Sequence, residues 1–164
     1  MESITYKLKA CTIRNKFNIL IIDDELEIAK MLGSVLEMRG HNITIETNGI
    51  SGLSRCQDNK FDIIFMDFHI DNMNGIDITD LLKNSCMNTA LIFAFTGDDS
   101  KSALKKFKEI GMIGAIIKPI DINIINKLMN SLEIKILDGI PTVGAIHNIK
   151  IIKSPEYRKH FFVF

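Results

Sequence analysis

Short apolar runs alternate along the chain with segments in which apolar residues recur every three or four positions. The runs cover residues 17–22, 42–47, 61–66, 90–95 and 115–117. Runs of this length that are rich in β-branched and aromatic residues are typical of strands buried on both faces of a parallel sheet. The intervening segments have the period of helices that pack one face on such a sheet. The pattern therefore predicts an α/β fold in which a strand–helix unit occurs five times.

The segments between the runs also carry signals that begin and end helices. Asp24 and Glu27 are three residues apart, which is the spacing of a capping box with Asp24 at the N-cap of the first helix. Gly40 follows the last apolar position of that helix and is expected just after its C-cap. Asp121 is expected to cap the last helix. The apolar positions of the five predicted helices fall within residues 28–36, 50–59, 78–82, 103–110 and 125–132.

The five units fill residues 17–134, which we interpret as one domain. Residues 1–16 form an N-terminal extension of mixed charge, and residues 135–164 form a C-terminal extension of unknown structure. The repeating pattern stops at Asp138-Gly139-Ile140-Pro141. The last four residues, Phe161-Phe162-Val163-Phe164, are too apolar to lie in water without cost. They either fold back on the domain, meet a partner or stay without fixed structure.

Composition narrows the class of protein. Hydrophobic residues make up 46% of the chain, and its 20 basic and 20 acidic residues cancel, which argues against a strongly electrostatic partner such as duplex DNA. No apolar run approaches the length of a membrane span, and no signal peptide is evident. The three cysteines lack CxxC spacing and are interpreted as reduced thiols of a cytoplasmic protein.

Chemically versatile residues stand where four of the apolar runs end. Asp23 and Asp24 follow the first run, Asp67 ends the third, Thr96 follows the fourth and Lys118 follows the fifth. Each has an ordinary structural explanation on its own, such as a helix cap, a local turn bond or a solvated lysine. The carboxyl ends of parallel strands share one edge of the sheet, however. We therefore expect all of these side chains to converge in one crevice.

Such a set of carboxylates, with one hydroxyl and one amine, is suited to moving a phosphoryl group onto a carboxylate. This chemistry depends on positioning and on neutralising the charge of the phosphoryl oxygens. Asp67 is the expected nucleophile and would become an aspartyl phosphate. Asp24 and Asp67 are expected to bind Mg²⁺, and Asp23 to bind it through a water. Lys118 and Thr96 are each expected to contact a phosphoryl oxygen.

These residues resemble the receiver domain of two-component response regulators, over roughly residues 17–134. The motifs that carry the resemblance are Asp23-Asp24, Asp67 with Gly75 eight positions later, Thr96 and Lys118-Pro119. Residues 111–120 are most similar to receivers attached to hybrid histidine kinases.

The resemblance implies a flavodoxin-like (βα)5 fold, which is a doubly wound parallel sheet with strand order 2-1-3-4-5. It implies Mg²⁺-dependent transfer of a phosphoryl group from a phosphohistidine to Asp67, with the backbone carbonyl of His69 as a further metal ligand. The protein would catalyse its own phosphorylation and dephosphorylation, and would not be a conventional enzyme. The expected partner is a histidine kinase or a histidine phosphotransfer protein, without nucleic acid or membrane, and the oligomeric state is left open. A cis Lys118–Pro119 bond is also expected.

The chain departs from the pattern of the family at three places, one of which spans two residues. Ile70-Asp71 stands where related receivers often have Met-Pro, and Gly97 stands where they usually have Ser or Ala. Ala115 stands where they often carry an aromatic residue. None of these departures removes a reacting group.

Three other functions fit part of the pattern. A haloacid-dehalogenase-type phosphatase also uses a strand-end Asp, but it needs a second acid two residues later, where this chain has His69. A flavodoxin-type FMN binder needs a phosphate loop after the first strand, where Asp23-Asp24-Glu25 would repel a phosphate that lacks a metal. The remaining alternative is a receiver-like module that binds partners without phosphorylation. A phospho-accepting receiver could itself serve as a stand-alone relay, a phosphate sink or a signalling module.

Overall fold

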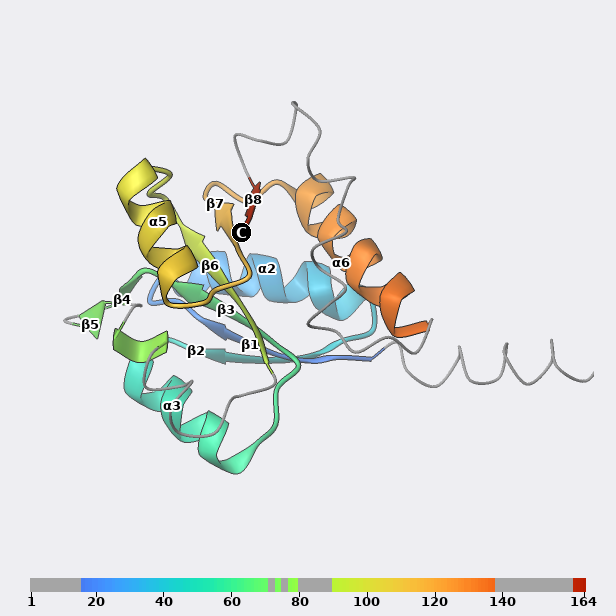
Figure 1. Ribbon diagram of the computed structural model, residues 1–164. Helices are drawn as coiled ribbons and strands as arrows, with labels where there is room; N and C mark the ends of the chain where they lie inside the picture. Colours follow the sequence, from blue (N-terminus) through green and yellow to red (C-terminus); the bar gives the residue numbers. More distant parts are fainter. Residues whose placement is uncertain (1–15, 71–72, 75–76, 80–89, 138–160) are drawn as a thin grey trace, which may run out of the picture.

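The computed structural model describes residues 16–70, 73–74, 77–79, 90–137 and 161–164 (Figure 1). The strands are β1 (Asn18–Ile22), β2 (Asn42–Glu46), β3 (Ile63–Asp67), β4 (His69–Ile70), β5 (Met73–Asn74), β6 (Leu91–Thr96), β7 (Gly114–Ile117) and β8 (Phe161–Val163). The helices are α2 (Leu26–Met38), α3 (Gly49–Asp58), α5 (Lys101–Glu109) and α6 (Ile122–Leu137), and residues 77–79 are also helical. Within these ranges no helix is both long and apolar enough to span a bilayer.

The main sheet contains six strands in the order β2-β1-β3-β6-β7-β8. The first five strands, β2 to β7 in this order, are parallel to one another. Numbered along the chain as predicted, these five strands lie in the order 2-1-3-4-5, so the flavodoxin-like topology is confirmed. β4 and β5 form a separate antiparallel ladder directly after β3.

A core lies on each face of the sheet because strand side chains alternate between the faces. Ile19 and Ile21 of β1 belong to the core that α2 and α6 cover. Leu20 and Ile22 of the same strand belong to the core that α3 and α5 cover. All four side chains are fully buried. A central strand of this kind needs an apolar residue at every position, which is why it appears in the sequence as an unbroken apolar run.

The first turn of α2 differs from the prediction. Glu25 is the N-cap residue and its side chain makes no capping hydrogen bond, so the prediction that Asp24 occupies the N-cap is wrong. Asp23 instead accepts a hydrogen bond at Oδ1 from the backbone N–H of Glu25, at 2.9 Å. This turn leaves the carboxylates of Asp23 and Glu25 free to reach the same lysine, Lys118.

Other local predictions hold. Gly40 has a φ of +90°, which favours glycine, and directly follows the C-cap of α2. Asp121 accepts a hydrogen bond from the backbone N–H of Asn123 at the start of α6, at 2.8 Å. The Lys118–Pro119 bond is cis. Gly75 and residues 80–82 of the predicted third helix lie outside the described residues.

The aromatic residues at the end of the chain fold back on the domain. β8 pairs antiparallel with β7 and extends the sheet by one strand, shown in red in Figure 1. Ala115 lies opposite Phe162, and Ile116 lies opposite Phe161. Of the three fates considered for this segment, the first is therefore the one observed.

Candidate functional site

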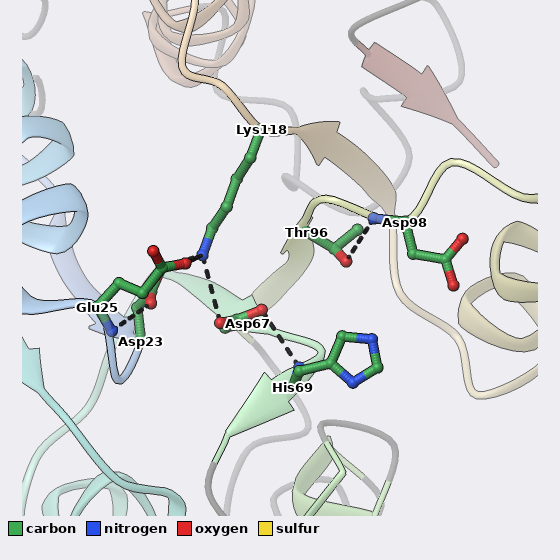
Figure 2. A network of polar contacts seen from close by, with 7 residues as sticks. All are labelled: Asp23, Glu25, Asp67, His69, Thr96, Asp98 and Lys118. Atoms are coloured by element: carbon green, nitrogen blue, oxygen red, sulfur yellow. Dashed lines mark hydrogen bonds and ion pairs between the residues drawn. The ribbon is translucent and has the colours of Figure 1, made fainter.

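The strand ends bring the predicted side chains to one edge of the sheet (Figure 2). Asp67 is the last residue of β3 and Thr96 is the last residue of β6. Asp23 directly follows β1, and Lys118 directly follows β7. These strands are neighbours in the parallel part of the sheet, so the strand-end argument from the sequence describes the arrangement correctly.

Lys118 is the centre of the cluster. Its Nζ lies 2.8 Å from Asp23 Oδ2, 3.0 Å from Glu25 Oε1 and 3.3 Å from Asp67 Oδ2. The ammonium also lies over the ring of Phe95, 5.0 Å from its centroid. One positive charge thus faces three carboxylates, and the cluster keeps an excess of negative charge.

The third carboxylate is Glu25, to which the sequence analysis assigned no role. Asp23, Glu25 and Asp67 each offer a carboxylate oxygen within 4.8 Å of the other two. Asp24 is exposed and lines the cavity through which the cluster opens to solvent, but it does not belong to this group of three carboxylates. The presence of three consecutive acids after a strand was the available signal. Which of them faces the site is decided by the turn into α2.

Asp23 carries the atom that indicates a cation site. Its Oδ2 is buried, and the Lys118 Nζ lies 2.8 Å from it as an ion-pair partner. A buried carboxylate oxygen needs a strong partner, and hard divalent cations take oxygen ligands of this kind. The donor set therefore fits an oxygen-coordinated metal ion.

Asp67 is a perturbed acid. Its side chain is 6% exposed, and burial raises the pKa of its carboxyl group to about 6. The Lys118 ammonium opposes this rise in pKa, the Asp23 carboxylate adds to it, and a hydrogen bond from the His69 N–H opposes it. For Lys118 burial lowers the pKa, but the contacts with Asp23 and Glu25 and the charge of Asp67 outweigh burial and raise the pKa above its ordinary value.

Thr96 and His69 flank Asp67. Thr96 is fully buried, and its Oγ1 accepts a hydrogen bond from the backbone N–H of Asp98 at 3.1 Å. The backbone N–H of His69 donates to Asp67 Oδ1 at 3.2 Å. The His69 side chain is exposed and lies edge-on to Phe68, with ring centroids 4.6 Å apart. His69 thus contacts Asp67 through its backbone.

The cluster opens to solvent through a cavity of about 540 Å³. Its lining combines the acidic side of the site with the loop after β6 and the turn after β7. The lining residues are Asp24, Glu25, Ile28, Asp67, His69, Gly97, Lys118 and Pro119. Asp67 is therefore reachable from outside although most of its surface is covered.

The chain is similar to known proteins over different parts of its length. Residues 19–130 match the family model described as the response regulator receiver domain. The CAI-1 autoinducer sensor kinase/phosphatase CqsS of Vibrio cholerae is 29% identical over 110 residues, which are 66% of this chain and 16% of that protein. Probable histidine kinase 1 of Oryza sativa subsp. indica is 31% identical over 94 residues, which are 55% of this chain and 10% of that protein. The chain thus spans a small part of the length of these curated relatives.

A solved structure supports the fold. The receiver domain of the Saccharomyces cerevisiae response regulator Ssk1, in co-crystals with the histidine phosphotransfer protein Ypd1, superposes with a TM-score of 0.67 at 20% identity, and the alignment covers 74% of this chain and 92% of that chain. The family model, in contrast, reaches from β1 into α6 and includes every strand end that contributes to the cluster. Because that match takes in well over half of the residues, the chain belongs to the response regulator receiver domain family.

Proposed function

We propose that this chain is a phospho-accepting receiver that takes a phosphoryl group from a phosphohistidine onto Asp67 in the presence of Mg²⁺. The observation that carries the proposal is the position of Asp67. It is a buried carboxylate at a strand end, 3.3 Å from the Lys118 ammonium, and it lines an open cavity. A phosphoryl donor can reach this carboxylate through the cavity, while the neighbouring ammonium and the buried surroundings set the charge of the carboxylate.

In the proposed transfer, a carboxylate oxygen of Asp67 attacks phosphorus while the phosphorus–nitrogen bond to the donor imidazole breaks. The electron pair of that bond returns to the imidazole nitrogen, and the new phosphorus–oxygen bond makes an acyl phosphate. Lys118 would contact one phosphoryl oxygen. The Oγ1 of Thr96 accepts the N–H of Asp98, which leaves the hydroxyl proton available to donate to another phosphoryl oxygen.

Mg²⁺ bound to the carboxylates would neutralise negative charge on the phosphoryl oxygens. We propose Asp23, Glu25 and Asp67 as the acids that hold it, because these three approach one another. The roles predicted for Asp24 and for the backbone carbonyl of His69 remain part of the proposal. Asp24 lines the cavity and would act from its mouth.

The proposed partner is a histidine kinase or a histidine phosphotransfer protein. Two relatives are named as kinases, and the receiver of Ssk1 was crystallised with such a phosphotransfer protein. The chain would then act as a relay, a phosphate sink or a signalling module, at a cytoplasmic location as predicted from its cysteines. The alternative is a module that binds its partner without phosphorylation.

The experiment that separates these functions is labelling by a small acyl phosphate with Mg²⁺, read by intact mass. We expect one phosphoryl group on the wild type and none on Asp67→Asn. Asp58→Asn is the matched control, because Asp58 is an exposed acid at the end of α3. Equal labelling of wild type and Asp67→Asn would contradict the assignment, and no labelling of the wild type would favour the binding module.

A further inference from the structure

The C-terminal strand β8 is bound to the strand that presents Lys118. It pairs with β7 over three residues, and Phe164 continues the contact through a hydrogen bond from its N–H to the carbonyl of Ile113, at 3.0 Å. β7 leads directly into Lys118, whose backbone N–H donates to the carbonyl of Thr96 at 2.8 Å. Residues 161–164, called the tail below, thus pair with the same short strand, β7, that ends at Lys118 of the candidate site.

On one face of the sheet, a row of buried side chains connects the two. Phe95, Ile116 and Phe161 lie opposite one another across β6, β7 and β8. They are 0%, 1% and 2% exposed and belong to the same core. The Lys118 ammonium lies over the ring of Phe95 at one end of this row. The ring of Phe161 at the other end also packs near Phe93, with centroids 6.3 Å apart.

Small residues on β6 and β7 leave room for the tail, those of the alanine pair on the other face of the sheet and Gly114 on the same face as Ile116. Ala94 lies opposite Ala115, and Ala115 lies opposite Phe162, which packs against the second core. Gly114 makes space as well, because a methyl group at this position would overlap the backbone carbonyl oxygen of Phe162. The sequence of β7 is therefore matched to a strand docked beside it.

We propose that β8 is an intramolecular ligand of the receiver sheet, and that its docking on β7 is coupled to occupancy of the Asp67 site. The coupling rests on the proposed function, since it requires that a phosphoryl group binds there. A phosphoryl oxygen would compete with Asp23 and Glu25 for the Lys118 ammonium. A new position of Lys118 changes its contact with Phe95 and the end of β7, and so alters the surface on which β8 is docked.

The direction of the coupling follows from the state in which docking is observed. β8 fits β7 while Lys118 is ion-paired with the three carboxylates. The proposal accordingly assigns docking to the unoccupied site, and we expect occupancy to loosen β8. Because coupling between two binding events is reciprocal, undocking β8 must strengthen binding at the site by the same factor.

The test uses the full chain with Mg²⁺ and beryllofluoride as the phosphoryl mimic. Hydrogen–deuterium exchange reports on residues 113–117 and 161–164, and titration gives the affinity for the mimic. We expect saturation with the mimic to speed exchange at residues 161–164 by about fivefold or more, which is the low end of ordinary coupling. Saturation without any change there would overturn the proposal.

Two variants test the reciprocal effect. Gly114→Ala disturbs the backbone fit and Phe162→Ser removes the ring, whereas Met38→Ser is a control on an exposed position of α2. Gly114→Ala and Phe162→Ser should each expose residues 161–164 and bind the mimic about fivefold more tightly, and the control should match the wild type. Exposure of the tail with unchanged affinity would overturn the coupling.

The outcome also separates this inference from the proposed function. If the wild type binds no mimic at all, the proposed function fails and the coupling fails with it. If the mimic binds and the tail does not respond, only the coupling fails.

Discussion

Glu25 and Lys118 are 93 positions apart in the sequence, and their side chains meet at 3.0 Å. Glu25 is 58% exposed, whereas Lys118 is 11% exposed, so the contact reaches from the surface into the site. Glu25 also belongs to the group of three carboxylates. It therefore has two competing partners in the proposed function, namely the ammonium and the metal ion.

The first prediction concerns Glu25 as a metal ligand. Glu25→Gln should weaken Mg²⁺ binding about three- to tenfold, because a partly exposed carboxylate contributes a modest charge interaction. Asp24→Asn should have a smaller effect, since Asp24 stands outside the group of three. The measurement is titration calorimetry with Mg²⁺. Glu27→Gln, also on the first turn of α2, is the control. A larger loss for Asp24→Asn than for Glu25→Gln would restore the assignment made from the sequence.

The second prediction concerns the removal of the ammonium. Lys118→Ala leaves a buried Asp23 carboxylate without its counter-charge, which should destabilise the metal-free protein by about 2–4 kcal/mol. Mg²⁺ should then raise the melting temperature of this variant more than that of the wild type, because the ion replaces the missing positive charge. Lys105→Ala, which loses only an exposed ion pair with Glu109, is the control. An equal Mg²⁺ response in variant and wild type would argue against a shared cation site.

The third prediction concerns pH. The pKa of Asp67 is raised from 3.8 to about 6, so between these values the folded protein holds a proton that the unfolded chain has lost. The free energy of unfolding therefore falls, through this group, as the pH rises across that window. Asp67→Asn lacks the effect. Without metal, the variant should match the wild type near pH 4 and exceed its stability by about 1–3 kcal/mol above pH 7.

Urea unfolding at a series of pH values measures this difference. Asp58→Asn serves again as the control for the loss of an exposed acid. A stability difference that does not depend on pH would mean that Asp67 is not the titrating group.

The fourth prediction concerns the hydroxyl of Thr96. Thr96→Ala should slow phosphorylation by an acyl phosphate about ten- to hundredfold, because it removes one donor to a phosphoryl oxygen. Thr96→Ser keeps the hydroxyl and should retain most of the rate. Rates from intact mass at short times measure both. If the serine variant is as slow as the alanine variant, the methyl group and its packing matter more than the hydroxyl.

The sequence is informative about the site wherever position along a strand decides the outcome. Asp67, Thr96 and Lys118 end apolar runs, and a parallel sheet aligns the ends of its strands, so their convergence could be predicted. The choice between Asp24 and Glu25 could not. It depends on the turn in which the Leu26 N–H donates to the Asp24 carbonyl and the Glu25 N–H donates to Asp23 Oδ1. Spacing alone suggested a capping box, which places the wrong residue at the N-cap.

The tail was unpredictable for a different reason. Four apolar residues are too few to show a period, and their partners on β7 are more than forty positions away. In the sequence, Gly114 and Ala115 appear only as small residues of a short strand. Their size is explained by the carbonyl and the ring of Phe162, which are contacts of the folded chain.

The antiparallel direction of β8 has a practical consequence for labelling. β7 runs toward Lys118, so β8 runs away from it, and Phe164 lies beside Ile113 at the amino end of β7. A fluorophore attached at residue 164 would leave the sheet at the edge opposite Asp67. The approach of a phosphohistidine donor would stay open, while the attached reporter would sit on the strand proposed to loosen. Residue 164 is therefore a natural place for a probe that reports on the site from a distance.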